Sequence, residues 1–209
     1  MSDQERWNER YRTDDAPWDT GRPEPLFVEA LGVHVFPNPP ARLLEIGCGV
    51  GTNARFFAAA GYEVVGVDLS TTAIDRAVAH ADSGAVRFEV LDVLREPLPE
   101  GPFDVVVDRG CFHVFDAHED RRTFVDRVAT ALRPGGVWLS IVGSTEGPAR
   151  DAGPPRRSAI DLATAIEPTL EIVALDRVTF SLDLDERTPA AWRCLSRQRE
   201  VPAQPSTQR

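Results

Sequence analysis

The sequence predicts an α/β protein built on a mostly parallel β-sheet. From residue 42 onward, apolar runs alternate with helical patterns, as expected when a helical crossover follows each parallel strand. A glycine-rich turn follows the first of these runs. A chain of 209 residues, 42% of them hydrophobic, is long enough to bury one substantial core. We therefore expect one domain over residues 34–200, preceded by a helical lid segment over residues 1–33.

The segment in front of the domain carries two helical patterns. Trp7 and Tyr11 are four residues apart, which places both rings on one face of a helix over residues 3–12. The prolines and the glycine that follow require an extended or turning path before a second helix near residues 25–32.

Within the domain, apolar runs and helical spacing predict the order of elements. We expect strands at residues 42–46, 63–67, 86–90, 103–107 and 137–142, and helices at 51–60, 71–80 and 119–132. Arg133-Pro134-Gly135-Gly136 ends the last of these helices. A helix at 158–166 then leads to strands near 171–179 and 191–198. Asp183 to Thr188 is too short for a helical crossover, so these two strands are predicted to be antiparallel. Residues 201–209, rich in Pro, Gln and Ser, are expected to form a disordered tail.

The glycine-rich turn is the most informative motif. Gly47, Gly49 and Gly51 follow one apolar run, and a second run ends on Asp68. Glycines permit positive φ and leave no Cβ between the backbone and a ligand at a helix N-terminus. Asp68 would lie at the carboxyl edge of its strand, where it can accept hydrogen bonds from ribose hydroxyls. The unit predicts nucleoside binding; the competing interpretation is a turn with only a structural role.

The spacing of this turn bears on which nucleoside it binds. The glycines follow a G-x-G-x-G pattern, with Glu45 two residues before the first, whereas the dinucleotide fingerprint is G-x-G-x-x-G. A carboxylate at the mouth of the turn suits a cation and repels a pyrophosphate. The motif therefore favours S-adenosylmethionine, which carries a sulfonium and no phosphate, over a nicotinamide or flavin nucleotide.

Composition excludes several classes of function. The net charge of −10 argues against a nucleic-acid partner, because phosphate binding depends on a basic surface. The sequence contains no lysine, which excludes Schiff-base chemistry, a pyridoxal phosphate lysine and a Walker A lysine. Three widely spaced cysteines suggest neither a disulfide framework nor a zinc site. With no apolar run near the ~20 residues that span a bilayer, we expect a cytoplasmic protein without a membrane partner.

Taken together, the motifs resemble those of the class I S-adenosylmethionine-dependent methyltransferases. The resemblance covers nearly the whole chain and rests on Leu44 to Asn53, Asp68, Leu91-Asp92-Val93, Phe103 to Asp108, and Leu132 to Gly136. It implies a Rossmann-like seven-stranded sheet in the order 3-2-1-4-5-7-6, with strand 7 antiparallel and helices on both faces. It also implies S-adenosylmethionine as methyl donor, S-adenosylhomocysteine as product, and no metal.

The resemblance assigns roles residue by residue. It implies Glu45, Gly47, Gly49 and Gly51 around the methionine part, Asp68 on the ribose, Asp92 near the adenine amino group, Val93 against the ring and Asp108 beside the methyl group. We add four candidate cofactor contacts, namely Tyr11, Trp18, Asn53 and Leu69.

Two details are similar to the thiopurine, thiol and halide methyltransferase branch. These are Pro17-Trp18-Asp19-Thr20-Gly21-Arg22-Pro23, and Asp108-Arg109-Gly110 followed by Gly153-Pro154-Pro155. In that branch the N-terminal segment closes over the cofactor and the arginine faces the acceptor. The resemblance thus implies that Trp18 is a cover and Arg109 an acceptor contact. Halide-methylating members tend to have an aromatic residue where this chain has Arg109, which argues against halide as the main acceptor.

The candidate catalytic residues are Asp108, Arg109 and His113. Arg109 would stabilise an anionic nucleophile and lower the pKa of a thiol; the alternative is a salt bridge with Asp108 or another acid. His113 would deprotonate a thiol, phenol or amine; the alternative is a histidine satisfied at a helix start. Trp18 either covers the sulfonium or pins the N-terminal segment to the core. Arg156 and Arg157 are expected to be a solvated loop pair; the alternative is that they gate the acceptor pocket.

These residues predict S-methylation of a small-molecule thiol or hydrosulfide by in-line displacement. Such a displacement needs positioning and a dry pocket more than a dedicated base. The alternatives are an O- or N-methyltransferase of a natural product, a non-catalytic S-adenosylmethionine-binding module, or a nicotinamide enzyme. We expect a small-molecule acceptor, no nucleic-acid partner, and a monomer or homodimer.

Overall fold

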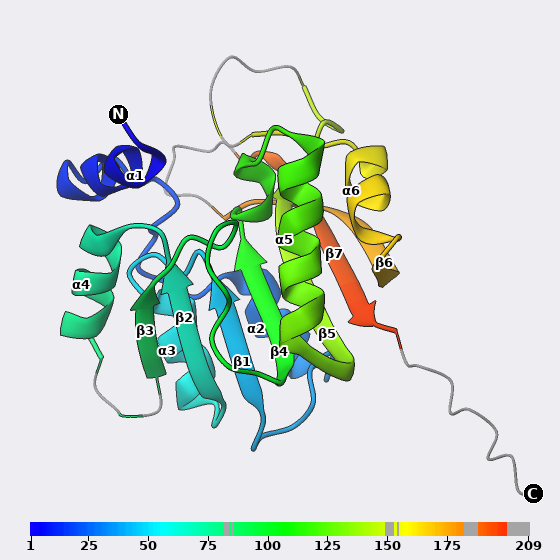
Figure 1. Cartoon of the computed structure of the whole chain (residues 1–209), viewed down its shortest axis with the longest axis horizontal. Coiled ribbons are helices and arrows are strands. Elements are labelled where there is room, and N and C mark those ends of the chain that lie inside the picture. Colours follow the sequence, from blue (N-terminus) through cyan, green and yellow to red (C-terminus); the bar gives the residue numbers. More distant parts are fainter. Residues whose placement is uncertain (82–83, 85, 149–152, 154, 182–187, 200–209) are drawn as a thin grey trace, which may run out of the picture.

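The computed structural model describes residues 1–81, 84, 86–148, 153, 155–181 and 188–199 (Figure 1). None of the helices in these ranges is both long enough and apolar enough to cross a membrane. The elements are α1 (Asp3–Arg12), α2 (Pro25–Gly32), β1 (Arg42–Ile46), α3 (Thr52–Ala59), β2 (Glu63–Asp68), α4 (Thr71–Ala79), β3 (Val86–Val90), β4 (Phe103–Arg109), the 3-10 turn η1 (Phe112–Val114), α5 (His118–Ala131), β5 (Leu132–Gly143), α6 (Ala159–Ile166), β6 (Leu170–Thr179) and β7 (Ala190–Gln198).

The seven strands form one sheet in the order β3-β2-β1-β4-β5-β7-β6, which confirms the predicted topology. The first five strands in this order are parallel, and β7 is antiparallel to both of its neighbours. The register pairs Ile46 of β1 with Val67 of β2 and with Asp108 of β4. The carboxyl ends of these three strands therefore meet at one edge, where open α/β sheets bind ligands.

Two hydrophobic layers hold the sheet between helices. Leu43 and Leu44 are neighbours on β1 that point to opposite faces, as the period of a strand requires. On the Leu43 side, Phe27 of α2 and Phe57 of α3 complete the core. On the Leu44 side the core includes Phe124 of α5, with α6 packed beside it. Figure 1 shows the helices on both sides of the twisted sheet, as predicted.

Helix α1 packs against α4 above the carboxyl edge of the sheet, where Figure 1 shows it beside the first turn of α4. Asn8 Oδ1 accepts hydrogen bonds from Ser70 Oγ at 2.8 Å and from the Thr72 N–H at 3.2 Å. Gln4 Nε2 donates to the Leu69 carbonyl at 3.1 Å. Side-chain amides of α1 thus bind polar groups at the start of α4, including the Thr72 N–H, which has no intrahelical partner.

Strand β5 differs from the prediction because it begins at Leu132 and not at residue 137. Phe103 of β4 pairs with Leu132, whereas Val105 pairs with Val137, so residues 133–136 form a bulge within the strand. Gly135 has φ 73°, which suits glycine. The predicted helix stop is therefore also an irregular part of the sheet. The predicted tail at 201–209 and most of the 183–188 connection lie outside the described residues.

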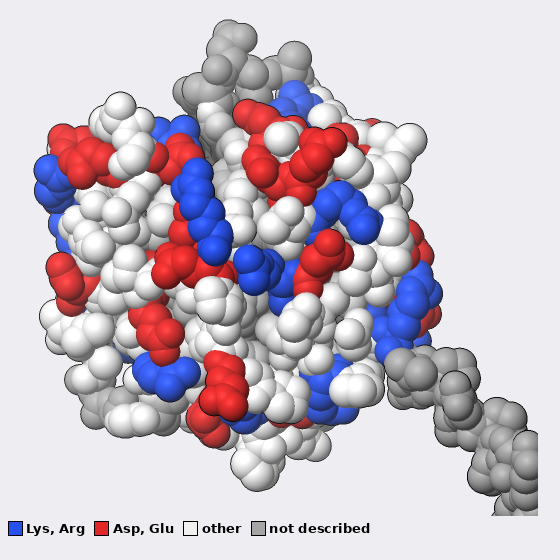
Figure 2. Space-filling view, viewed as in Figure 1, with Lys and Arg blue, Asp and Glu red and all other residues white. Residues whose placement is uncertain are grey.

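Surface charge is mixed on the face shown in Figure 2. Arginine and acidic side chains are interspersed over α4 and α5. After β3, the exposed Arg95 forms an ion pair at the surface with the partly buried Asp92 at 2.7 Å. Pairs of this kind contribute little to stability.

Candidate active site

The turn after β1 is shaped by three glycines in the left-handed region. Gly47, Gly49 and Gly51 have φ values of 72°, 53° and 78°. The N–H groups of Gly47 and Cys48 donate to the Val67 carbonyl at 2.8 and 3.0 Å. These bonds fix the turn to the end of β2, in a conformation that residues with a Cβ adopt only under strain.

Close neighbours reinforce this requirement for glycine. A Cβ on Gly49 would lie 2.7 Å from the Tyr11 hydroxyl, and one on Gly51 would lie 2.5 Å from the Phe88 ring. A Cβ on Gly47 would lie 2.8 Å from the Cys111 Cβ. Side chains from α1, β3 and the segment after β4 thus surround the turn.

Glu45 is a buried carboxylate with one unsatisfied oxygen. Its side chain is 1% exposed, and Oε1 accepts a hydrogen bond from Asn53 Nδ2 at 3.0 Å. Oε2 has no hydrogen-bond partner among the described residues. Burial raises the pKa of Glu45 to about 8. A buried oxygen in this state is costly, and a ligand cation or hydrogen-bond donor would satisfy it.

Asp68 ends β2 beside the same turn. Its Oδ2 accepts the Gly49 N–H at 2.9 Å, and its Oδ1 accepts the Ser70 N–H at 2.8 Å. Burial raises the pKa of Asp68 in spite of these bonds, which act in the opposite direction. Each carboxylate oxygen has a second lone pair, so both can accept a further hydrogen bond.

Asp92 and Val93 follow β3 and lie next to this group. The Leu91 N–H donates to the Asp68 carbonyl at 2.9 Å, which holds the segment at the same edge. Asp92 Oδ1 accepts the Leu94 N–H at 3.0 Å, so this carboxylate also shapes its own turn. Val93 is 7% exposed and belongs to the core.

An aromatic cluster in the N-terminal segment lies over the turn. Trp18 Nε1 donates to the Tyr11 hydroxyl at 3.1 Å, and the Trp18 ring packs edge-on against Trp7 with centroids 5.5 Å apart. The Arg10 guanidinium lies 4.3 Å from the Trp18 ring centroid. Burial raises the pKa of Tyr11 well above its usual value. These contacts join Trp18 to α1, within the N-terminal segment itself.

Asp108 is enclosed by protein at the end of β4. Its side chain is fully buried, and Oδ1 accepts the N–H groups of Cys111 and Phe112 at 3.1 and 3.0 Å. Oδ2 accepts from Trp138 Nε1 at 3.0 Å. Burial raises the pKa of Asp108 to about 6. The carboxylate therefore fixes the start of η1.

Arg109 is committed to partners within the protein. Its Nε pairs with Glu24, its Nη1 donates to the Trp18 carbonyl at 3.4 Å, and its Nη2 donates to the Ser181 carbonyl. The sequence left a salt bridge open as an alternative, and the acid is Glu24 rather than Asp108.

His113 lies in η1 against the same aromatic ring as Arg109. The ring centroids of His113 and Phe180 are 5.7 Å apart, and the Arg109 guanidinium carbon lies 5.3 Å from the Phe180 centroid. His113 Nδ1 accepts the Gly143 N–H at 2.9 Å. Because Nδ1 is the acceptor, the neutral imidazole carries its proton on Nε2.

Comparisons with known proteins agree with this geometry. Residues 43–136 match a family model described as a methyltransferase domain. A solved structure from work on the "Conversion of a Disulfide Bond into a Thioacetal Group during Echinomycin Biosynthesis" superimposes with a TM-score of 0.81 at 28% identity, over 94% of this chain and 92% of that one. The chain contains a methyltransferase domain and has the fold of the class I S-adenosylmethionine-dependent methyltransferases.

Curated relatives match this chain over shorter spans. The "Probable thiol methyltransferase 2" of Arabidopsis thaliana is 28% identical over 153 residues, which are 71% of this chain and 65% of the relative. The "2-heptyl-1-hydroxyquinolin-4(1H)-one methyltransferase" of Mycobacteroides abscessus is 29% identical over 60% of this chain and 55% of the relative. The chain thus spans between about half and two thirds of the length of these relatives.

The structure corrects one expectation about Arg156 and Arg157. Arg157 is not solvated, because its side chain is 12% exposed. Its Nη2 donates to the carbonyls of His113 and Phe115 at 2.7 and 3.0 Å. Arg156 Nε donates to the Ser144 carbonyl at 2.9 Å. These two arginines therefore support the segments that follow β4 and β5.

Sequence reasoning missed Glu24 and Asn8. Glu24 is 3% exposed, its N–H donates to Asn53 Oδ1 at 2.8 Å, and it is the N-cap residue of α2. An acidic residue just before Pro25 at a predicted helix start is a signal that could have marked it. Nothing in the local sequence marks Asn8, whose partners are more than sixty positions away.

Proposed function

We propose that this methyltransferase methylates the sulfur of a small-molecule thiol or hydrosulfide. When bound, S-adenosylmethionine supplies an electrophilic methyl group: the acceptor sulfur bonds to the methyl carbon as the carbon–sulfonium bond breaks, leaving S-adenosylhomocysteine. The protein's task is to hold the two molecules in line and to exclude water.

The residues around the glycine turn suit this cofactor. We assign Glu45 to the cationic methionine end, since a positive charge beside its unpaired oxygen would stabilise the buried carboxylate and lower its raised pKa. Asp68 would accept from the ribose, and Asp92 and Val93 would contact the adenine. Tyr11 and Trp18, with the Leu69 segment on which α1 rests, would cover the bound molecule. Within the described ranges, no group of three His, Cys, Asp or Glu side chains gathers as metal ligands.

The hydrogen bonding of Asp108 and His113 carries the proposal for a sulfur acceptor. Both oxygens of Asp108 accept hydrogen bonds inside the protein, and His113 Nδ1 already accepts one. Asp108 is also fully buried, and these bonds hold both side chains in contacts that shape the protein, so neither is placed as a dedicated base. Thiols ionise near neutral pH without a dedicated base, with an unperturbed pKa of about 8.5, whereas phenols do so near about 10. Of these acceptors, a thiol therefore has the least need of a general base in this site.

Two of the relatives also involve sulfur. One is named a probable thiol methyltransferase, and the solved structure comes from work on a disulfide that becomes a thioacetal. A second candidate, O-methylation of a natural product, is favoured by the similarity to the hydroxyquinolinone methyltransferase. We further propose a reducing, cytoplasmic setting, since Cys48, Cys111 and Cys194 are all unpaired thiols. We also propose a monomer or homodimer.

The test is release of S-adenosylhomocysteine from S-adenosylmethionine with a panel of acceptors. The panel contains hydrosulfide, alkyl and aryl thiols, iodide, phenols and amines. We expect release with sulfur acceptors alone. Release with phenols or amines but not with thiols would establish the second candidate instead. Calorimetric binding of S-adenosylhomocysteine without release from any acceptor would favour a binding module.

A further inference from the structure

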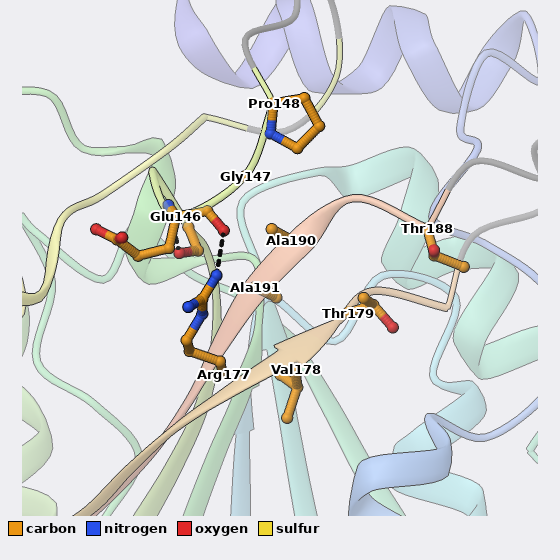
Figure 3. Close-up of a pocket in the computed structure, with 10 residues that line it drawn as sticks. Glu146, Gly147, Pro148, Arg177, Val178, Thr179, Thr188, Ala190 and Ala191 are labelled. Atoms are coloured by element: carbon orange, nitrogen blue, oxygen red, sulfur yellow. Dashed lines mark hydrogen bonds between the residues drawn. The ribbon is translucent and has the colours of Figure 1, made fainter.

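A pocket of about 460 Å³ lies beyond the candidate active site, between the segment after β5 and the ends of β6 and β7 (Figure 3). Figure 3 shows Glu146 and Arg177 on one side of it and Thr179 and Thr188 on the other. We propose that this pocket binds the body of the methyl acceptor, and that the acceptor is a thiol carried on a peptidic or multi-ring organic molecule. This inference rests on the proposed function and specifies its substrate class.

The pocket shares backbone segments with the Arg109 and His113 cluster. Ser144 lines the pocket, and its neighbour Gly143 donates to His113 Nδ1. Thr179 lines the opposite wall, and two residues later the Ser181 carbonyl accepts from Arg109. The pocket thus begins one residue beyond the carboxyl end of β5, the strand that pairs with β4, whereas the glycine turn follows β1 on the other side of β4.

The rim of the pocket is held in place by hydrogen bonds. Arg156 donates to the carbonyls of Ser144 and Gly147, at 2.9 and 3.0 Å. Arg177 Nη2, on β6, donates to the Glu146 carbonyl at 3.2 Å, a bond drawn in Figure 3. These bonds join the segment after β5 to the edge of the sheet. Small-molecule sites are commonly formed in advance in this way, which lowers the cost of binding.

The lining determines the class of ligand. Val178, Ala190 and Pro148 supply apolar surface, Thr179 supplies a hydroxyl, and the rim carries both charges through Arg177 and Glu146. An apolar body with amide or hydroxyl groups and balanced charge fits this wall. The volume lies within the range of about 300–1,000 Å³ that holds drug-sized molecules, whereas hydrosulfide would leave the pocket nearly unfilled.

Filling the pocket provides the test. Thr179 is exposed at the end of β6, so Thr179→Phe places an aromatic ring in the pocket at a position where strands accept aromatic residues. Thr179→Val is the matched control, because it keeps the shape and removes only the hydroxyl. Val173→Phe is the second control, because Val173 is 45% exposed on the same strand and does not line the pocket.

Binding is measured by calorimetry on protein saturated with S-adenosylhomocysteine. The ligands are glutathione, 2-naphthalenethiol and a cyclic dipeptide that carries a cysteine thiol. We expect at least one of them to bind the wild type and both controls, and to bind Thr179→Phe at least about tenfold more weakly. We expect S-adenosylhomocysteine affinity to be unchanged in all variants, because none of the three substitutions lies at the glycine turn.

Two results would overturn the proposal. One is equal affinity of Thr179→Phe and the controls for every large thiol that binds; the other is that none of these thiols binds the wild type. Failure of the proposed function would look different. In that case the wild type would fail to bind S-adenosylhomocysteine, or would bind it and methylate no sulfur acceptor, whatever residue stands at position 179.

Discussion

Arg109 and Glu24 form an ion pair in which the two side chains are 10% and 1% exposed. It joins the end of β4 to the first residue before α2, across 85 positions of sequence. The other nitrogens of the guanidinium bind carbonyls of Trp18 and Ser181. One side chain thus ties the N-terminal segment, the central sheet and the connection after β6 together at the candidate active site.

The first prediction concerns this pair. Arg109→Ala leaves the Glu24 carboxylate buried without its partner, which costs about 3–5 kcal/mol. Urea unfolding should show the loss as a lower midpoint. The double variant Arg109→Met, Glu24→Gln should recover most of the lost stability, because it leaves no unpaired buried charge. A stable Arg109→Ala protein with a raised KM for the acceptor alone would contradict the positioning role and restore Arg109 as an acceptor contact.

The second prediction concerns Glu45 and pH. The pKa of this carboxyl is raised to about 8, so the ligand-free protein is largely protonated there at neutral pH. A ligand ammonium favours the carboxylate, and binding therefore releases a proton. We expect S-adenosylhomocysteine affinity to rise up to about tenfold per pH unit between about pH 6 and about pH 7.5. Calorimetry in buffers of different ionisation enthalpy measures both the affinity and the proton release, and Glu45→Gln should abolish the dependence.

The raised pKa of Glu45 also predicts a cost in stability: the carboxylate that favours ligand binding destabilises the ligand-free fold. A carboxyl whose pKa is higher in the folded chain than in the unfolded chain destabilises the fold as pH rises. For Glu45 this loss runs from pH 4.5, its ordinary pKa, to about pH 8, its pKa in the folded chain. Glu45→Gln removes this penalty. At about pH 8 we expect the ligand-free variant to have a higher melting temperature than the wild type, by roughly 2–4 °C for each kcal/mol of stability gained. We also expect it to bind S-adenosylhomocysteine more weakly. A lower melting temperature for the variant at this pH would contradict the buried, raised carboxyl.

The third prediction concerns Gly49. Gly49→Ala combines a left-handed φ of 53° with a Cβ placed 2.7 Å from the Tyr11 hydroxyl. The backbone strain alone costs about 1–3 kcal/mol, and S-adenosylhomocysteine affinity should fall at least about tenfold. Adding Tyr11→Phe should restore part of the loss, because it removes the contacting oxygen. Gly32→Ala is the control, since nothing lies within 4 Å of its Cβ; equal effects of the two alanine variants would contradict this account.

The fourth prediction concerns His113. Asparagine in its place offers Oδ1 as an acceptor for the Gly143 N–H, which is 2.9 Å from Nδ1 in the native chain. With a thiol acceptor we expect kcat to stay within about threefold, because no general base is lost, whereas loss of a true base costs about 10²–10⁴. The pH profile with thiols should be unchanged. A hundredfold loss confined to phenols or amines would identify His113 as a base for those acceptors.

Much of the fold follows from local sequence because its elements are short and regular. The apolar runs that became β1 and β2 and the glycine turn between them carry their own periodicity and backbone requirements. The bulge at residues 133–136 could not be predicted from local sequence, since it depends on which residues of β4 pair with which residues of β5. A register between two strands is a tertiary property.

The same distinction separates the two halves of the candidate site. Glu45, Asn53 and Asp68 lie close together in sequence and form one hydrogen-bonded group with the turn, so a motif could indicate them. The partners of Arg109 and His113 are 85 and 30 positions away. Charge and spacing at those residues suggested chemistry, whereas the folded chain uses both in contacts that shape the site.

The antiparallel end of the sheet has an evolutionary consequence. β6 and β7 join the sheet only through the pairing of β7 with β5, while the glycine turn and Asp68 belong to the parallel strands on the other side of β4. Substitutions in the terminal hairpin can therefore reshape the proposed acceptor pocket without disturbing the backbone that surrounds the nucleoside. Descendants of such a chain would change substrates by mutation at one edge of the sheet and inherit the methyl-donor site intact.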